Sequence, residues 1–312
     1  MNKLLEFSTT ELSNLISSKK ISSEELVYES LSQIKEKDPK INSFITVLEE
    51  KALQKAKDLD KKLSNNDIEH KFLTGIPIML KDNIATKGIK TTAASKILEN
   101  YVSPYDSFVT KKILSNNGIL IGKGNLDEFA MGSSNETSFF GPVKNPWDIN
   151  RVPGGSSGGP AAAVSAGFVS CSLGSDTGGS IRQPASLCGV TGMKPTYGTV
   201  SRYGLIAFAS SLDQIGPFAR TAEDCGNILN VISGKDNNDS TSYEKKFNNF
   251  NSKINEDIAG LKIGIPKDYL KNVDLEIKSI LEKSIKEFEN LGAIVEEIEL
   301  PLTEYCMDVY YI

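Results

Sequence analysis

The stretch "SFVTKKILSNNG" at residues 107–118, followed directly by "ILIGK" at residues 119–123, decides the fold class. The first piece is typical of a helix and the second of a short strand rich in β-branched residues. Another such strand, "GIPIML", lies at residues 75–80, and the helix-then-strand order recurs in "AAAVSAGF" (161–168) and "VSCSLGS" (169–175). This alternation predicts an α/β fold, with a mixed or largely parallel central sheet layered between helices.

The sequence divides into four segments. Residues 1–70 predict amphipathic helices, one of which starts at a capping box formed by Ser22 and Glu25. Residues 71–232 hold the α/β core with its glycine- and serine-rich motifs. Residues 233–257 are rich in Asn, Asp, Ser and Lys and predict an exposed polar excursion, and residues 258–312 predict a β-α-β extension. The N-terminal helices are expected at 8–18, 21–39 and 41–63.

Composition narrows the functional classes. The 312 residues are 39% hydrophobic and 24% charged, as in an ordinary globular chain, and no run of about 18 apolar residues predicts a membrane span. Without a signal-peptide pattern, a cytoplasmic location is expected. The net charge of −5 supplies no basic field for a polyanion, so another subunit would hold any nucleic acid. The four widely spaced cysteines form no C-x-x-C pair and are predicted to be buried structural thiols.

A candidate nucleophile lies in "GSDTGGSIRQP" at residues 174–184. Ser180 follows two glycines at the expected start of a helix. The backbone N–H groups of Thr177, Gly178, Gly179 and Ser180 could form a nest that stabilises the oxyanion of a tetrahedral intermediate. The glycines could also serve only as turn residues, and the spacing lacks the lysine of a phosphate-binding P-loop.

The base that would activate such a serine is not obvious. The one histidine, His70, lies in the polar stretch "NNDIEHKF" and is expected in an exposed loop. "GGSSGG" at residues 154–159 matches G-x-S-x-G, but an α/β-hydrolase needs its histidine after the serine. Lys81 follows the apolar "GIPIML", where burial could lower its pKa enough for it to act as a base. Spacing alone favours the alternative, a strand-end lysine that reaches solvent.

Three motifs taken together, "LKDN" (80–83), "GGSSGG" and "GSDTGGSIRQP", resemble the amidase signature family of serine hydrolases. The resemblance implies that Ser180 is the nucleophile and Lys81 the terminal base. It also implies that Ser156 is a relay serine between them, joined to Gly155 by a cis peptide bond.

Two longer stretches, at residues 124–148 and 192–221, are similar to the A subunits of glutamyl-tRNA(Gln) and aspartyl-tRNA(Asn) amidotransferases. This similarity implies a glutaminase that forms a γ-glutamyl ester on its serine and delivers ammonia to a B subunit. The B subunit would bind the misacylated tRNA and phosphorylate it with ATP and Mg²⁺. A small C subunit would hold the A and B subunits together. This chain would need no cofactor. Substrate contacts are implied for Met131, Gly132, Ser133 and Tyr311.

The chain also departs from the family pattern. Pro160 stands where serine is common, at an expected first helical position where little effect is predicted. Thr199 replaces an arginine, which could weaken an ion pair or an interface contact.

The chain ends at Ile312, before the region that completes the sheet and the glutamine clamp in the family, so we expect a single but incomplete amidase domain over 1–312 with an exposed sheet edge. A stand-alone amidase acting on other small amides and a non-catalytic truncated fragment are the alternative interpretations.

Overall fold

The computed structural model describes residues 3–243, 249–271 and 273–312. The chain divides into two compact units, an N-terminal unit, Met1–Asn251, and a C-terminal unit, Ser252–Ile312. The boundary falls inside the predicted polar excursion, of which residues 244–248 lie outside the described residues.

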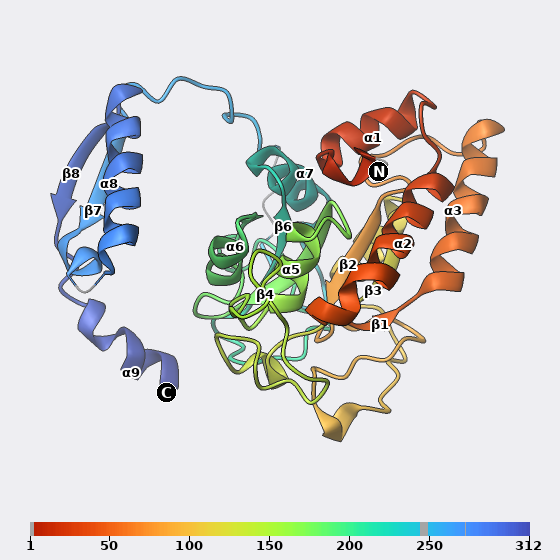
Figure 1. Ribbon diagram of the computed structural model, residues 1–312, viewed down its shortest axis with the longest axis horizontal. Helices are drawn as coiled ribbons and strands as arrows, with labels where there is room; N and C mark the ends of the chain where they lie inside the picture. Colours follow the sequence, from red (N-terminus) through yellow and green to blue (C-terminus); the bar gives the residue numbers. More distant parts are fainter. Residues whose placement is uncertain (1–2, 244–248, 272) are drawn as a thin grey trace. The chain divides into compact units, whose positions relative to one another are not determined.

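The N-terminal unit is built on a mixed six-stranded sheet with the strand order β1-β3-β2-β4-β6-β5 (Figure 1). The central strands β3, β2 and β4 run parallel, whereas β1, β6 and β5 pair antiparallel with their neighbours. The strands are β1 Phe44–Val47, β2 Pro77–Lys81, β3 Ile119–Gly124, β4 Cys171–Asp176, β5 Thr191–Gly192 and β6 Gln214–Ala219. The predicted mixed sheet is therefore confirmed.

Helices cover both faces of this sheet, because successive strand side chains point to opposite sides. Met79 of β2 packs into one apolar cluster, and its neighbours Ile78 and Leu80 pack into the other. The Met79 cluster includes side chains from α2 (Ser23–Ile41), α3 (Glu49–Ser64), α5 (Gly158–Ser165) and α6 (Arg182–Cys188); the opposite cluster includes side chains from α1 (Thr9–Ser17), α4 (Phe108–Ser115) and α7 (Ala222–Ile232). Short 3₁₀ helices lie at Lys3–Glu6, Lys96–Leu98 and Glu128–Ala130.

The N-terminal helices differ from the prediction at one place. The capping box that starts α2 is confirmed, with the Ser22 side chain accepting from the Glu25 N–H and Glu25 accepting from the Ser22 N–H at 2.8 Å. The helix predicted over 41–63 is wrong for residues 44–47, which form β1. The β-branched sequence "FITV" pairs antiparallel with β3, and the helix begins only at Glu49.

Part of the predicted polar excursion is folded onto the N-terminal unit. Asp236 and Asp239 are buried, so the exposure predicted for them is wrong. The Ser201 hydroxyl donates to Asp236 at 2.7 Å and the Arg202 N–H donates to Asp239 at 2.8 Å, which satisfies both carboxylates. Thr199 is buried beside this contact, and its carbonyl accepts from the Gly234 N–H.

Pro160 is the third residue of α5, rather than the first as the sequence analysis expected. It still lies in the first turn, where a backbone N–H has no partner within the helix, so a proline, which lacks that N–H, loses no helical hydrogen bond there. Its carbonyl accepts a hydrogen bond from the Ser172 hydroxyl at 2.8 Å, which ties α5 to β4.

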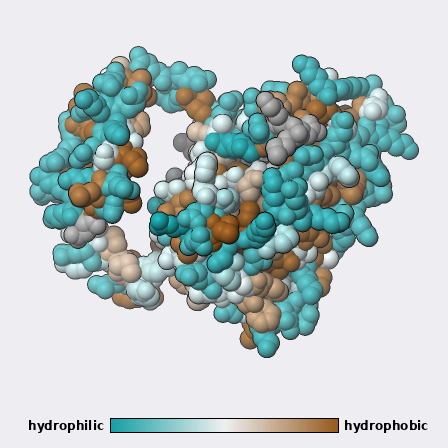
Figure 2. Space-filling view, in the orientation of Figure 1, coloured by the Kyte–Doolittle hydropathy of each residue, from teal (hydrophilic) through white to brown (hydrophobic). Residues whose placement is uncertain are grey.

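The C-terminal unit has the β-α-β order that its sequence predicts. Strands β7 (Lys262–Pro266) and β8 (Ile294–Ile298) pair in parallel, and α8 (Leu275–Asn290) connects them. Of the described residues of this unit, only Ala293 is buried, and Figure 2 shows apolar side chains at the unit's surface. A 3₁₀ helix at Lys267–Leu270 lies between β7 and α8, and after β8 a second 3₁₀ helix at Thr303–Tyr305 leads to α9 (Cys306–Tyr311).

The cysteines of the two units differ in burial. Cys171, Cys188 and Cys225 are buried, and burial raises the pKa of each thiol to about 12, so the prediction of structural thiols fits these three. Cys306 is exposed, which contradicts that prediction, because it lies in the C-terminal unit. No helix among the described residues is long and apolar enough to cross a membrane.

Candidate active site

Lys81 lies at the carboxyl end of β2, in the middle of the sheet. Its side chain is fully buried, so the alternative of a lysine that reaches solvent is excluded. The ammonium group donates to Ser156 Oγ at 2.7 Å and to Ser175 Oγ at 2.9 Å. Because β2 and β4 run parallel, Lys81 and Ser175 reach the same edge of the sheet, the edge where α/β proteins commonly bind their ligands.

Ser156 reaches Lys81 from the turn that precedes α5. It is fully buried and follows Gly155 in a cis peptide bond, as the family resemblance predicts. Only glycine fits before it, because a Cβ on Gly155 would lie 2.1 Å from Oδ2 of Asp127. The next residue, Ser157, binds β4 instead, with its hydroxyl donating to the Ser175 carbonyl at 3.0 Å.

The surroundings of Lys81 suit it to proton transfer. Burial lowers its pKa from 10.5 to about 7, against the opposing negative charges of Asp127, Asp176 and Asp213. Near neutral pH, a substantial fraction of Lys81 is therefore the free amine, which can accept a proton from a serine hydroxyl.

Ser180 lies between β4 and α6 and is half-buried. Its carbonyl accepts from the Ser157 N–H at 3.2 Å, which brings its backbone next to the Ser156 turn. Ser156 Oγ is bonded to Lys81, and within the described residues no hydrogen bond joins it to the Ser180 hydroxyl. The structure thus joins Lys81 and Ser156 directly and places the backbone of Ser180 next to the Ser156 turn.

The predicted oxyanion nest is altered by Asp176. The Gly179 N–H donates to Asp176 Oδ1 at 2.8 Å, so Gly179 is a corrected prediction: its amide already has a carboxylate partner. Asp176 also accepts from the Ile181 N–H at 3.0 Å and forms an ion pair with Arg182 at 3.0 Å. The remaining candidates for an oxyanion are the amides of Thr177, Gly178 and Ser180.

Several polar residues support the site without having been predicted. Asn83 donates to Ser175 Oγ at 3.0 Å, so the Ser175 hydroxyl serves both Asn83 and Lys81. Asp213 accepts from the Thr177 hydroxyl and from the Phe208 N–H at 3.0 Å, which ties the nest to the loop before β6. Asn83 stands inside the "LKDN" motif, but nothing in the sequence pairs Asp213 with Thr177.

The four predicted substrate contacts fall in two places. Met131, Gly132 and Ser133 are exposed residues of one loop that follows β3. Tyr311 is in α9 of the C-terminal unit, where it is 78% exposed and its ring packs edge-on against Tyr310. Their roles in binding glutamine stay predictions.

His70 is half-buried, rather than exposed as predicted, and burial lowers its pKa.

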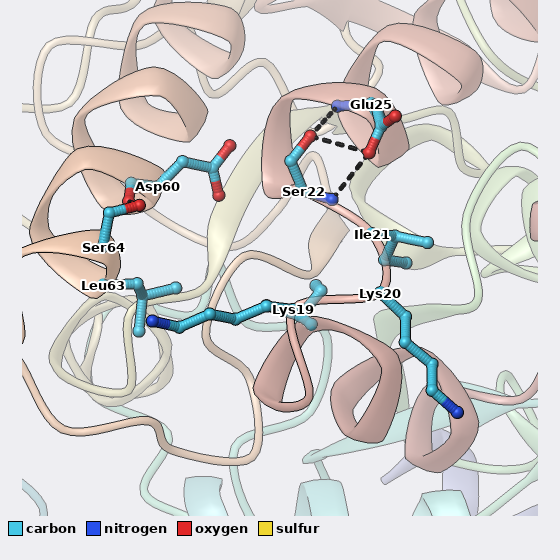
Figure 3. A pocket seen from close by; sticks show the side chains of 9 residues that line it. Lys19, Lys20, Ile21, Ser22, Glu25, Asp60, Leu63 and Ser64 are labelled. Atoms are coloured by element: carbon cyan, nitrogen blue, oxygen red, sulfur yellow. Dashed lines mark hydrogen bonds between the residues drawn. The ribbon is translucent and has the colours of Figure 1, made fainter.

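A separate pocket of about 270 Å³ lies between the α1–α2 connection and α3 (Figure 3). It is lined by Lys19, Lys20 and Asp60 among others, and contains none of the triad residues. Asp60 already accepts from the Ser23 and Glu24 N–H groups, so its carboxylate caps α2.

Comparison with known proteins adds the family. The profile of the amidase family matches residues 25–312. The chain belongs to the amidase family. It is 52% identical, over 99% of its length and 63% of the relative's, to a protein of Caldanaerobacter subterraneus subsp. tengcongensis that is named as the A subunit of glutamyl-tRNA(Gln) amidotransferase.

Solved amidase structures agree with this. The crystal structure of the A subunit of glutamyl-tRNA(Gln) amidotransferase from Thermotoga maritima matches with a TM-score of 0.88 at 45% identity, over 100% of this chain and 65% of that one. The peptide amidase of Stenotrophomonas maltophilia matches with a TM-score of 0.90 at 29% identity, over 98% of this chain and 64% of that one. The chain thus spans just under two thirds of the length of these amidases.

Proposed function

We propose that this chain is the glutaminase part of a tRNA-dependent amidotransferase, with Lys81, Ser156 and Ser180 as its catalytic triad. The observation that carries the proposal is the 2.7 Å hydrogen bond between the fully buried Lys81 amine and Ser156. Burial holds the pKa of this lysine at about 7, so it can both take and return a proton at neutral pH.

In the first half of the reaction, Ser180 Oγ attacks the side-chain amide carbon of glutamine. The Ser180 proton passes to Ser156, while Ser156 gives its own proton to neutral Lys81. The amides of Thr177 and Gly178 stabilise the oxyanion, and each such donor is worth about 3 kcal/mol of transition-state energy. The C–N bond then breaks, the leaving nitrogen takes the proton back through Ser156, and ammonia departs.

In the second half, the γ-glutamyl ester on Ser180 is hydrolysed. Water loses a proton along the same Ser156–Lys81 route, attacks the ester carbon, and releases glutamate as Ser180 regains its proton. Lys81 ends each half in the protonation state in which it began, so no other base is required.

The ammonia would be used by partners. Relatives that are 52% identical are named as the A subunit of glutamyl-tRNA(Gln) amidotransferase, which supports B and C subunits as the partners. We propose that the B subunit binds the misacylated tRNA and activates it with ATP and Mg²⁺, so the acidic surface of this chain need not bind nucleic acid. Met131, Gly132, Ser133 and Tyr311 are proposed to contact glutamine.

The test is ammonia release from glutamine by the 312-residue chain, alone and co-produced with B and C subunits. The decisive variant is Ser180→Ala, for which we expect at least a roughly 10³-fold loss because the acyl-enzyme cannot form. Ser186→Ala is the matched control, since Ser186 is an exposed serine of the neighbouring helix α6 and should keep full activity.

The outcomes separate the alternatives. Glutamine hydrolysis that needs Ser180 supports the proposal. Hydrolysis of other small amides in preference to glutamine, without the partners, would instead make the chain a stand-alone amidase. A folded chain that releases no ammonia from any amide would overturn the catalytic proposal.

A further inference from the structure

Asp127 is a buried acidic residue between the relay serine and the loop at 131–137. It follows the end of β3, is fully buried, and takes part in no ion pair of the described residues. Its own N–H donates to the carbonyl of Ser156 at 3.1 Å. Its carboxylate accepts from the Asn135 N–H at 2.9 Å and from the Thr137 hydroxyl at 2.9 Å.

The fit around this carboxylate is tight on two sides. A Cβ on Gly155 would lie 2.1 Å from Asp127 Oδ2, and a Cβ on Gly132 would lie 2.4 Å from Asp127 Cγ. Both neighbours must therefore be glycine for their backbones to approach the carboxylate this closely. One belongs to the cis peptide of Ser156 and the other to the loop predicted to contact substrate.

We propose that Asp127 is a positioning residue that fixes the Ser156 turn and the 131–137 loop relative to each other. A carboxylate that accepts several hydrogen bonds in a dry site holds its neighbours more firmly than a neutral group does. Because Ser156 must stay within hydrogen-bond reach of Lys81, a small shift of this turn would interrupt the proton route. The inference rests on the proposed glutaminase function for its kinetic consequences.

Asp127 also acts on Lys81 through its charge. Burial lowers the pKa of Lys81, and the negative charge of Asp127 is the largest of the opposing influences, ahead of Asp176 and Asp213. The nearby buried lysine, Lys123, is paired with Asp82 at 2.9 Å. Removing the charge of Asp127 should therefore lower the pKa of Lys81 further, so the free amine would persist at lower pH.

Asp127→Asn removes the charge while nearly keeping the shape. We expect its kcat/KM for glutamine to fall about 100-fold, because an amide NH₂ then replaces one acceptor oxygen beside the Asn135 N–H, which displaces the 131–137 loop and the Gly155–Ser156 peptide packed against it. We also expect the acid limb of the pH profile to move to lower pH. Thr137→Val, which removes one donor to Asp127 and leaves the charge, should reduce kcat/KM less and leave the acid limb in place.

Asp224→Asn is the matched control. Asp224 is also fully buried and accepts from two N–H groups and one hydroxyl, of Thr9 and Thr10, at 2.7 to 3.0 Å. It should lower stability without moving the acid limb. A pH profile for Asp127→Asn that matches the wild type, or an equal shift in Asp224→Asn, would overturn the electrostatic part of the inference.

A second readout needs no activity. The Asn135 and Thr137 amides donate to the Asp127 carboxylate at 2.9 and 3.4 Å, so their hydrogen exchange should speed up in Asp127→Asn and stay unchanged in Asp224→Asn. The ¹³Cε resonance of Lys81 should titrate at lower pH only in Asp127→Asn. If the wild type releases no ammonia yet these changes occur, the proposed function fails and the inference stands. If the wild type is active but loop exchange and titration do not change, the inference fails alone.

Discussion

The two units of the chain differ in how far their side chains are buried. The N-terminal unit buries two apolar clusters on opposite faces of its sheet and encloses Lys81 completely. The C-terminal unit has regular elements, with parallel β7 and β8 joined by α8, yet Ala293 is the one buried residue among those described. Regular secondary structure therefore does not by itself create a chemical site. Only the enclosed unit lowers the pKa of a lysine as it does for Lys81, because desolvation requires burial.

The largest expected effect concerns lysines in the two units. Lys81→Met should reduce glutamine hydrolysis about 10⁴-fold, since it removes the terminal base. Lys283→Met, at an exposed position of α8, should leave activity unchanged. In the wild type, kcat/KM should rise with pH up to about 7 and then level, because protonated Lys81 cannot accept a proton. A rate that is flat between pH 5 and 8, measured by ammonia release, would contradict Lys81 as the base.

The motifs named the candidate residues of the site but not the contacts that connect them. Lys81, Ser156 and Ser180 stand in short motifs whose residue types carry the chemistry, and the structure brings their segments together. Asp127 and Ser175 were missed because their roles depend on contacts between distant segments, which no local pattern records. The same reason explains Gly179, whose amide was predicted to be free until the fold showed Asp176 bonded to it.

The fold follows a similar rule. Helix periodicity and β-branched runs predicted most elements, including α2 with its capping box and the β-α-β of the C-terminal unit. The short strand β1 was hidden because "FITV" adjoins a strongly helical stretch and becomes a strand only by pairing with β3. The burial of Asp236 and Asp239 was missed because their carboxylates accept hydrogen bonds from residues 201 and 202, and the polar composition of their own segment does not show these contacts.

Ion pairs give the next contrast. Asp82 and Lys123 are both buried and lie 2.9 Å apart, whereas Lys267 and Glu297 of the C-terminal unit are exposed and 3.7 Å apart. Lys123→Met should lower the free energy of unfolding by about 4 kcal/mol, since it leaves the Asp82 charge buried and unpaired. Lys267→Met should change it by less than about 0.5 kcal/mol.

Urea unfolding followed by circular dichroism measures both changes. The double variant Asp82→Asn/Lys123→Met should recover part of the loss, because neither charge then remains buried alone. Equal losses for Lys123→Met and Lys267→Met would mean that the two pairs are equally enclosed, and the contrast between the units would fail.

The smallest expected effect concerns two leucines inside helices. Leu26 of α2 is fully buried, whereas Leu281 of α8 is 39% exposed. Leu26→Ala should lower the free energy of unfolding by about 3 kcal/mol because it leaves a cavity in a packed cluster. Leu281→Ala should cost less than about 1 kcal/mol, since the side chain already contacts water and leaves no enclosed cavity. Both variants change leucine to alanine within a helix, so helix propensity affects them equally and the difference reports packing alone. If Leu281→Ala proved as costly as Leu26→Ala in the same urea titration, the apolar face of α8 would be covered in solution, and the C-terminal unit would have to be treated as part of a packed core.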